Sequence, residues 1–587
     1  MCSIIGYKGD LYAAPVLIDS LKRMEYRGYD SVGISTIDDG TMIVRKGVGK
    51  VSEVSKNLDL NGMPGKTGIG HTRWATHGRV NDVNAHPHTD CSGSIAIVHN
   101  GIIENYEELR IELRSRGHLF KSDTDSEVIA HLLEEHHSSD KDIKSAMIKT
   151  CKRLKGAFAF ISVYENGTLG GARFDEPLIV GLDKNGCFIS SDVLGFLKYT
   201  DKAIFLDNRD IVIVDKSGVQ LFDFDGNPVN RHPTVVAWEL GAADKGRYAH
   251  YTIKEIHEQS KSMFAASNKD EEKLNQFCNF LSTAESVYIT GSGSSYHAAL
   301  IGKYLFAKYP KIRAECVMSS EFQYVQDLID DNSVVIAISQ SGETADVLQA
   351  VKSAKQKGAT ILSLVNITTS SLARISDSFL EIGCGPEIGV AATKSFTSQL
   401  SLLYRITSNI CKDVQLSNSL GDLAKPTQVT LSLESEIEKI SNNIKNFKDI
   451  YIMGRSLHYP IALEGALKIK ELTYVHAEGI AAGELKHGPL AVVDKNTLVI
   501  VINPSDSTYN DIVSNAHEIK ARGATIIGIS DVRNSMFDYL IRIPKVDEIL
   551  YPLIEVIPFQ LLAYHLALVS NADPDYPRNL AKSVTVK

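Results

Sequence analysis

The distribution of apolar and polar positions divides the chain into two regions. In the first 230 residues, short apolar runs end in turn residues, which predicts strands over 94–101, 156–167 and 210–218. A helical period predicts one helix over 126–137, with Ser126 as its N-cap. Because strands outnumber helices, we expect an α+β fold in this region.

After a charged, weakly patterned bridge at 251–262, apolar strands alternate with helical stretches. This alternation is typical of parallel sheets with helices on both faces. Three segments also recur in the same order at nearly the same offset, which indicates a duplication. We therefore predict two α/β doubly wound subdomains, at 277–415 and 445–570. The recurring pairs are 288–295 with 451–458, 334–344 with 498–508, and 354–366 with 518–531.

The most apolar long window, 551–570, has nearly the length of a membrane span. It contains Glu555, Pro558, Gln560 and His565, which favour a helix buried in a protein core. We therefore expect no association with a membrane.

Composition fits a soluble globular protein. Hydrophobic residues make up 43% of the 587 residues and charged residues 23%, and the formal net charge of −9 leaves no basic footprint for nucleic acid. The eight cysteines stand singly, which fits a reducing compartment and neither a disulfide framework nor a zinc site. With no signal peptide at the start, we expect a cytoplasmic protein. The histidines at 86–88 and 136–137 lack convincing further ligands, so we expect no metal and no other cofactor.

Cys2 is the first candidate for chemistry. If Met1 is removed, Cys2 carries both a thiol and a free α-amino group. A thiol titrates near pH 8.5 and an α-amino group at about 7.7–8.0, so the amine can accept the thiol proton directly or through a water. Nucleophile and base would then come from one residue. The alternative is a small buried structural cysteine.

Two hydroxyl-rich turns follow predicted strands of the second region. Ser294 and Ser295 lie in "ITGSGSSYHAAL", where a glycine-containing turn leads into a helix whose N–H groups point outward. The next turn, "SQSGETADV", supplies further polar groups. Ligands bind at the carboxyl ends of strands in open α/β sheets, so the two turns predict a site for a phosphorylated small molecule. The second turn contributes Ser339, Gln340, Ser341 and Thr344.

The corresponding turns of the second repeat have lost most of these hydroxyls. That repeat instead carries Lys468 and Glu471, three residues apart on one helix face, and His487 before a Gly-Pro pair. Taken alone, these residues are typical of a surface ion pair and a structural histidine.

Several motifs in a fixed order resemble one family along the whole chain. They are "RMEYRGYDSVG", "GHTRWATHG", "HNGIIENY", "SDTDSEVIAH", "SQSGETADV", "ELKHGPLA" and the tail "PRNLAKSVTVK". The chain resembles the isomerizing glutamine–fructose-6-phosphate aminotransferases. The resemblance implies a four-layer αββα glutaminase domain at 2–235, a linker at 236–276, two sugar isomerase (SIS) domains at 277–415 and 445–570, and a catalytic tail at 571–587.

The resemblance also implies roles for residues of the glutaminase domain. Cys2 would attack the glutamine carboxamide and release ammonia, which passes to the sugar through an internal channel with Trp74 as its gate. Asn100 and Gly101 would form the oxyanion hole. Glutamine would be held by Arg73 and Asp125, through its α-carboxylate and its ammonium group, and covered by a loop with Trp74, Thr76, His77 and Gly78.

For the second region, the resemblance implies that fructose 6-phosphate contacts the hydroxyl-rich turns. Lys582 would form a Schiff base with the open-chain ketose, Glu471 would move a proton between C1 and C2, and Lys468 would tune that site. His487 would assist ring opening from a neighbouring subunit, which implies a homodimer. The sugar-binding set comprises Ser294, Ser295, Ser339, Gln340, Ser341, Thr344 and Lys468.

Three positions depart from the family pattern: Ser3 replaces Gly beside the nucleophile, Ser294 replaces Thr, and Ala392 replaces a common Ser. Two alternatives stay open. A phosphoribosyl amidotransferase shares the N-terminal Cys but needs a phosphoribosyltransferase domain, and a sugar-phosphate-sensing regulator would need no Cys2, Glu471 or Lys582.

Overall fold

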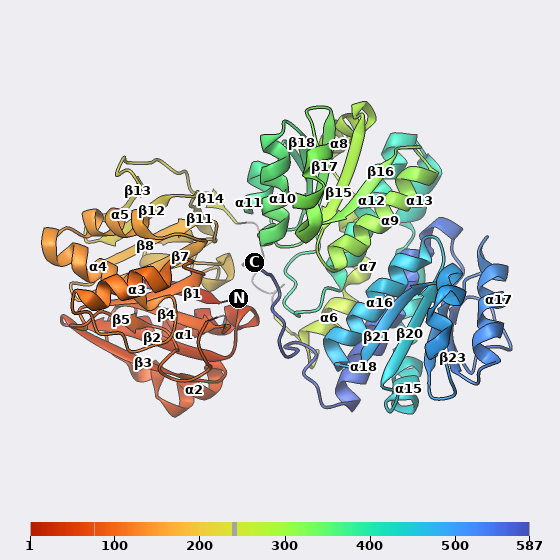
Figure 1. Ribbon diagram of the computed structural model, residues 1–587, viewed down its shortest axis with the longest axis horizontal. Coiled ribbons are helices and arrows are strands. Elements are labelled where there is room, and N and C mark those ends of the chain that lie inside the picture. Colours follow the sequence, from red (N-terminus) through yellow and green to blue (C-terminus); the bar gives the residue numbers. More distant parts are fainter. Residues whose placement is uncertain (1, 76, 237–243, 586–587) are drawn as a thin grey trace. The chain divides into compact units, whose positions relative to one another are not determined.

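The computed structural model describes residues 2–75, 77–236 and 244–585 (Figure 1). The chain forms two compact units. Unit 1 comprises Met1–Leu240 and Ala581–Lys587, and unit 2 comprises Gly241–Leu580. Each unit has its own sheets and is described by itself.

Unit 1 contains two antiparallel sheets. The eight-stranded sheet has the order β14-β11-β9-β10-β1-β4-β2-β3 and the six-stranded sheet the order β13-β12-β8-β7-β6-β5. The first sheet comprises β1 (Ser3–Gly9), β2 (Ser31–Asp38), β3 (Thr41–Val48), β4 (Thr67–Arg73), β9 (Ile179–Asp183), β10 (Gly186–Ser190), β11 (Lys202–Phe205) and β14 (Thr234–Val235). The second comprises β5 (His88–Thr89), β6 (Ile95–Gly101), β7 (Phe158–Tyr164), β8 (Leu169–Phe174), β12 (Asp210–Asp215) and β13 (Gly218–Asp223).

Strand β6 shows why the two sheets pack face to face. Its successive side chains point to opposite faces, and both faces are apolar. Ala96 and Val98 join the core between the sheets, whereas Ile95 and Ile97 join the core under the helices. The outer layers are α1 (Ala13–Met24) and α2 (Val51–Asn57) on one sheet, and α3 (Tyr106–Ser115), α4 (Glu127–Asp140) and α5 (Ile143–Arg153) on the other. The predicted four-layer αββα fold is confirmed.

Unit 2 contains two parallel five-stranded sheets with the same strand order, β16-β15-β17-β18-β19 and β21-β20-β22-β23-β24. The equal order confirms the predicted duplication. The first sheet comprises β15 (Ser286–Gly291), β16 (Ala314–Met318), β17 (Ser333–Ser339), β18 (Thr360–Val365) and β19 (Ser378–Glu381). The second comprises β20 (Asp449–Gly454), β21 (His476–Ala481), β22 (Leu498–Ile502), β23 (Thr525–Ser530) and β24 (Tyr539–Arg542).

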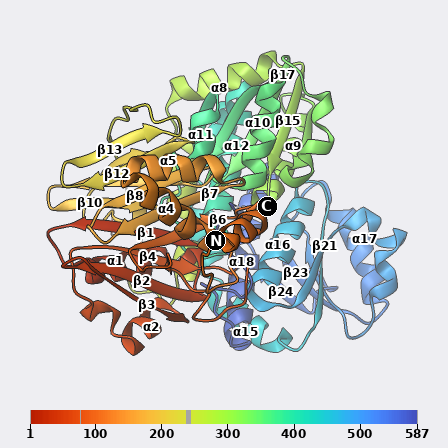
Figure 2. The same ribbon diagram turned by 60° about the vertical axis from the view of Figure 1, so that its left-hand side comes forward.

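Helices cover both faces of each sheet, because the strands are apolar on both sides. In the first sheet, Val335 packs toward α10 (Ala345–Gln356), and Ile336 packs toward α9 (Ser294–Lys308) and α12 (Lys394–Cys411). Figure 2 shows α16 and α18 beside the second sheet. The remaining helices are α6 (Tyr251–His257), α7 (Gln259–Ser267), α8 (Glu271–Thr283), α11 (Ser371–Ile375), α13 (Val414–Gly421), α14 (Ala424–Leu431), α15 (Glu434–Ile444), α16 (His458–Thr473), α17 (Tyr509–Lys520) and α18 (Tyr551–Val569).

Helix α18 is the apolar helix that the sequence predicts as a core element. The segment Glu548–Val569 is long and apolar enough to span a membrane, but 89% of its most apolar window is buried within the protein. It packs against α15 and α16, which confirms the prediction.

Two details differ from the sequence-based expectations. Ser126 precedes α4 but does not cap it, because its hydroxyl contacts His99 Nδ1 at 2.8 Å and donates to Asp125 instead. The range expected as a linker contains α6 and α7, and α7 packs along α12.

Candidate active sites

Cys2 lies directly before β1, and its thiol is held by the backbone of the residue after β4. Sγ accepts a hydrogen bond from Trp74 N at 3.2 Å and lies 3.4 Å from Trp74 O. Burial raises the pKa of the Cys2 thiol, and the Trp74 N–H and the Arg73 charge lower it by less. The thiol therefore needs a base to become a nucleophile.

The neighbours of Cys2 fit an acyl-transfer site. Ser3 is buried and donates to Met24 O at 3.0 Å, so its hydroxyl has a partner within the protein. Asn100 Nδ2, at the end of β6, donates to Cys2 O at 3.1 Å. Gly101 follows with φ +108°, and a Cβ there would lie 2.1 Å from Ala157 O, so only glycine fits. Asn100 thus lies beside Cys2, with Gly101 next to it in the chain.

Arg73 organises the loop after β4. Its guanidinium donates to the carbonyls of Arg79 and Gly78 at 3.2 Å each, and also to the carbonyl of His77. The His77 ring packs edge-on against Tyr106, and Trp74 packs edge-on against Tyr29. Thr76, predicted in the same loop, lies outside the described residues.

Asp125 is buried and lies close to Arg73. Its Oδ2 accepts from Ile103 N at 2.8 Å and its Oδ1 from Ser126 Oγ at 3.4 Å. Burial lowers the pKa of Arg73, whereas the charges of Cys2 and Asp125 act in the opposite direction. A cation, a carboxylate and a thiol therefore share one environment, which suits the two charged groups of an α-amino acid.

Sequence reasoning missed a group of buried histidines around these strands. His71 stacks on His86 with ring centroids 4.0 Å apart, and His86 contacts His88 edge-on. His99 Nδ1 lies 2.8 Å from Ser126 Oγ, whose hydroxyl in turn contacts Asp125. Burial lowers the pKa of all four histidines, so they are neutral near pH 7. His99 therefore positions Asp125 through Ser126.

The hydroxyl-rich turns of unit 2 end two neighbouring strands, β15 and β17. These strands flank the position where the strand order reverses, which is the usual ligand site of such sheets. Ser339 Oγ accepts from Gly342 N at 3.0 Å and lies 3.2 Å from Thr344 Oγ1. Ser341 Oγ accepts from Glu343 N at 3.2 Å. The turn thus gathers hydroxyls and N–H groups without a cation.

The other residues predicted to contact the phosphate differ in their hydrogen-bond partners. Ser295 Oγ accepts from Gln399 Nε2 at 3.1 Å, and Gln340 accepts from Asn366 N through its backbone carbonyl at 3.2 Å. Ser294 Oγ donates to Glu464 at 2.8 Å, so this side chain bonds to helix α16.

Helix α16 places three charged residues on one face at the ends of these turns. Lys468 Nζ lies 2.5 Å from Glu471, 3.4 Å from Glu464 and 3.3 Å from Ser294 Oγ. Burial would lower the pKa of Lys468, but the two carboxylates raise it to about 12. Glu464 was missed from sequence, although its spacing to Lys468 and Glu471 puts all three on one helical face.

The corresponding turns of the second sheet are filled by carboxylates. His458, equivalent to Ser295 in the repeat, contacts Glu555 at 2.6 Å and Asp506 at 2.7 Å. Ser505, equivalent to Ser341, donates to Asp531 at 2.5 Å. Negative charge at these positions opposes phosphate binding, so only the first sheet retains an anion cradle.

Two further predicted residues are His487 and Lys582. His487 is exposed at the end of the 3-10 helix Ala482–His487. Lys582 lies in the tail segment that belongs to unit 1.

Comparisons with known proteins identify the kinds of domain in the chain. A glutamine amidotransferase domain model matches residues 71–198, and a SIS domain model matches residues 280–407 and 443–570. The chain is 45% identical over 598 residues to a glutamine–fructose-6-phosphate aminotransferase (isomerizing) of Pyrococcus horikoshii, and 44% identical over 604 residues to that of Aquifex aeolicus, with 100% of both chains covered in each case.

A solved structure shares the architecture of unit 2. The C-terminal domain of glucosamine-fructose-6-phosphate aminotransferase from Francisella tularensis aligns with 57% of this chain and 99% of its own length, at a TM-score of 0.53 and 34% identity. The two SIS matches leave no support for a phosphoribosyltransferase region, and the full-length similarity to enzymes argues against a purely regulatory protein. The chain belongs to the isomerizing glutamine–fructose-6-phosphate aminotransferase family.

Proposed function

We propose that this protein uses glutamine to convert fructose 6-phosphate into glucosamine 6-phosphate and glutamate. The observation that carries the proposal is that one chain holds a thiol beside Asn100 and Gly101 and also a serine-lined turn at the reversal point of a parallel sheet.

In the first reaction, the Cys2 thiolate adds to the carboxamide carbon of glutamine. The proton leaves to the α-amino group that removal of Met1 would expose. Asn100 and the Gly101 N–H stabilise the oxyanion, and such donors contribute about 3 kcal/mol each. The carbon–nitrogen bond breaks, ammonia leaves, and water hydrolyses the thioester to glutamate.

Arg73 and Asp125 select the substrate of this reaction. A guanidinium pairs with the α-carboxylate and a carboxylate with the ammonium group. Their burial strengthens both interactions, because little water competes.

In the second reaction, the turns at Ser295, Ser339, Ser341 and Thr344 hold the phosphate. The Lys582 amine condenses with the open-chain ketose and loses water, and ammonia then displaces the amine at C2. Glu471 removes a proton from C1 and returns it to C2, which converts the ketose imine into the amino aldose. Lys468 orients Glu471 through their ion pair.

Coupling the reactions requires that ammonia be kept from bulk water, where it would be protonated and diluted. We further propose that His487 acts on the sugar of a second subunit, since its side chain is exposed in its own chain, so the active form is a homodimer. A cytoplasmic location fits the eight free cysteines.

The test incubates full-length protein with glutamine and fructose 6-phosphate, and measures glucosamine 6-phosphate by chromatography. Cys2→Ala should abolish glutamine-dependent product but keep product formed from ammonium chloride, whereas Lys582→Ala should abolish both. Cys411→Ala is the matched control, because Cys411 is an exposed free thiol. Undiminished glutamine-dependent synthesis by Cys2→Ala would overturn the proposal, and an intact mass that retains Met1 would overturn the role of the α-amine.

A further inference from the structure

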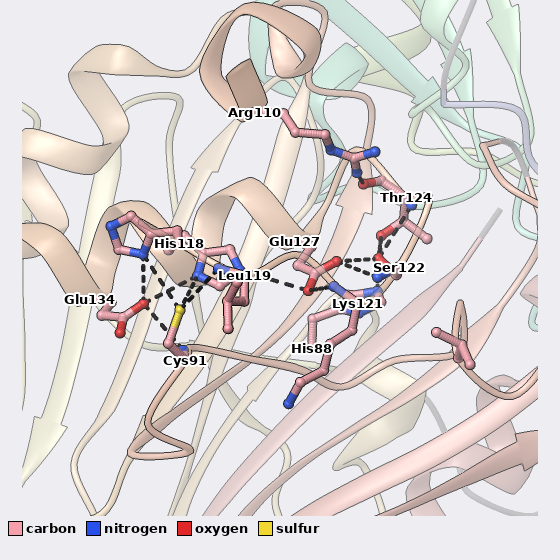
Figure 3. A network of polar contacts seen from close by, with 12 residues as sticks. His88, Cys91, Arg110, His118, Leu119, Lys121, Ser122, Thr124, Glu127 and Glu134 are labelled. Atoms are coloured by element: carbon pink, nitrogen blue, oxygen red, sulfur yellow. Dashed lines mark hydrogen bonds and ion pairs between the residues drawn. The ribbon is translucent and has the colours of Figure 1, made fainter. Parts of the chain in front are cut away.

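Unit 1 contains a cluster of metal-ligating side chains that the glutaminase chemistry does not use. Cys91 lies after β5, His118 follows α3, and His131 and Glu134 lie on α4. Figure 3 shows Cys91, His118 and Glu134 pointing toward one another. One sulfur, two nitrogens and one oxygen all lie within 4.8 Å of one another.

The distances between these atoms match a tetrahedral site. Cys91 Sγ lies 3.8 Å from His118 Nδ1 and 3.6 Å from His131 Nδ1. Glu134 Oε2 lies 2.9 Å and 3.1 Å from the same two nitrogens. Around a tetrahedral ion with bonds of about 2.0–2.3 Å, neighbouring ligand atoms are about 3.3–3.6 Å apart. Shifts of a few tenths of an ångström would therefore complete the coordination.

The kind of donor selects the metal. Thiolate and imidazole ligands favour Zn²⁺, whereas Mg²⁺ and Ca²⁺ prefer oxygen ligands. Four protein ligands leave no open position for a water or substrate, which is typical of a structural zinc ion.

The surroundings of the cluster support the same conclusion. His131 Nε2 faces Glu127 Oε1 at 3.7 Å, and His118 Nε2 faces Glu135 Oε2 at 3.9 Å. Each ring thus turns Nδ1 to the cluster and its other nitrogen to a carboxylate, as zinc-bound histidines commonly do. Leu119 N–H also donates to Cys91 Sγ at 3.4 Å.

We propose that Cys91, His118, His131 and Glu134 bind one structural zinc ion. This site is hard to recognise in the sequence, because the ligands are spread over three segments and only His131 and Glu134 share a helix. The expectation of no metal considered the histidines at 86–88 and 136–137, none of which belongs to the cluster.

The ion would also fasten the segment that carries Asp125. Glu127, which faces His131, accepts from Lys121 N and Ser122 N at 2.7 Å each. Zinc would therefore link residues 118–127 to the loop that contains Cys91 and to helix α4. The expected effect of zinc on glutamine binding rests on the proposed function, whereas the proposal that zinc binds does not.

The experiment measures zinc in full-length, tag-free protein by mass spectrometry after growth with added zinc and dialysis. Wild type should retain one zinc per chain, and Cys91→Ser and His131→Gln should retain less than a tenth of that. Cys411→Ser and His136→Gln are the matched controls, since His136 lies on the same helix outside the cluster. Circular dichroism checks folding, and Cys91→Ser is the variant that decides, because Cys91 is exposed and its loss leaves the core intact.

Cobalt provides a second readout that reports the ligands directly. The Co²⁺-loaded wild type should show a sulfur-to-cobalt charge-transfer band and the intense visible absorption of four-coordinate cobalt, and Cys91→Ser should lose the charge-transfer band. Equal zinc in wild type and Cys91→Ser, or a cobalt spectrum without the sulfur band, would overturn the proposal. A glutamine KM that is unchanged by zinc removal would overturn only the link to Asp125.

Discussion

Lys468 Nζ and Glu471 Oε2 are 2.5 Å apart, one turn apart on helix α16. Only 1% of the Lys468 side chain is exposed, against 20% for Glu471. The lysine is thus the fixed member of the pair, and the carboxylate is the member that solvent or a substrate can reach. This arrangement suits a base that exchanges a proton with a bound sugar.

Replacing Glu471 with Gln should remove the proton transfer and leave the fold intact, because Lys468 keeps Glu464 as a partner. We expect ammonia-dependent synthesis to fall by about 10²–10⁴-fold. Glutaminase activity, measured as glutamate release, should stay near wild type. Glu478→Gln is the control, since Glu478 is an exposed carboxylate on the neighbouring β21. Equal synthesis rates in both variants would remove Glu471 from the mechanism.

The sequence predicted those parts of the molecule that depend on local patterns. Strand β6 ends at Gly101 as expected, because a short apolar run and a terminal glycine both act over a few positions. The two hydroxyl-rich turns were found for the same reason, since each follows an apolar strand directly.

Contacts between distant segments could not be predicted in this way. The bond from Ser126 to His99 replaced a helix cap because β6 brings the histidine to that position. The cluster around Cys91 joins a loop, a turn and a helix, and no single window of sequence contains it. The role proposed for Lys582 depends on the family resemblance alone, because no local pattern around this lysine indicates a function.

Stability should depend on pH through His458. Burial alone would lower the pKa of His458, but Glu555 and Asp506 raise it to about 10. Because the folded-state pKa lies above the ordinary value of 6.5, its contribution is complete below about pH 6.5 and is lost as pH rises through about 10. Urea unfolding followed by circular dichroism between these pH values should show the loss.

His458→Gln should destabilise unit 2 by roughly 3–5 kcal/mol, because Glu555 would stay buried without a cation. The free energy of unfolding of His458→Gln should also fall less steeply as pH rises. His476→Gln should keep both the stability and the decline, since the His476–Asp449 pair is more than half exposed. A decline of unchanged slope in His458→Gln would assign it to other groups.

Arg73→Lys should weaken glutamine binding. A lysine keeps the charge but cannot hold the carbonyls of His77, Gly78 and Arg79 while also pairing with a carboxylate. Losing one charge-assisted hydrogen bond costs about 1.5–3 kcal/mol, so the KM for glutamine should rise roughly 10–150-fold. Steady-state glutaminase assays measure this KM, and Arg79→Lys is the control because the Arg79 side chain is exposed. A KM within twofold of wild type would contradict the assigned role.

Gly101→Ala should disable the glutaminase reaction more than any neighbouring glycine substitution. The added Cβ would lie 2.1 Å from Ala157 O at a φ of +108°, so β6 or the β7 end must move, and the oxyanion donors move with them. We expect kcat for glutamate release to fall by about 10²–10³-fold, while ammonia-dependent synthesis continues. Gly93→Ala separates this effect from backbone strain, because Gly93 also has a positive φ of +76° but an added Cβ there meets nothing within 4 Å. If both variants lost the same activity, strain rather than oxyanion geometry would explain the result.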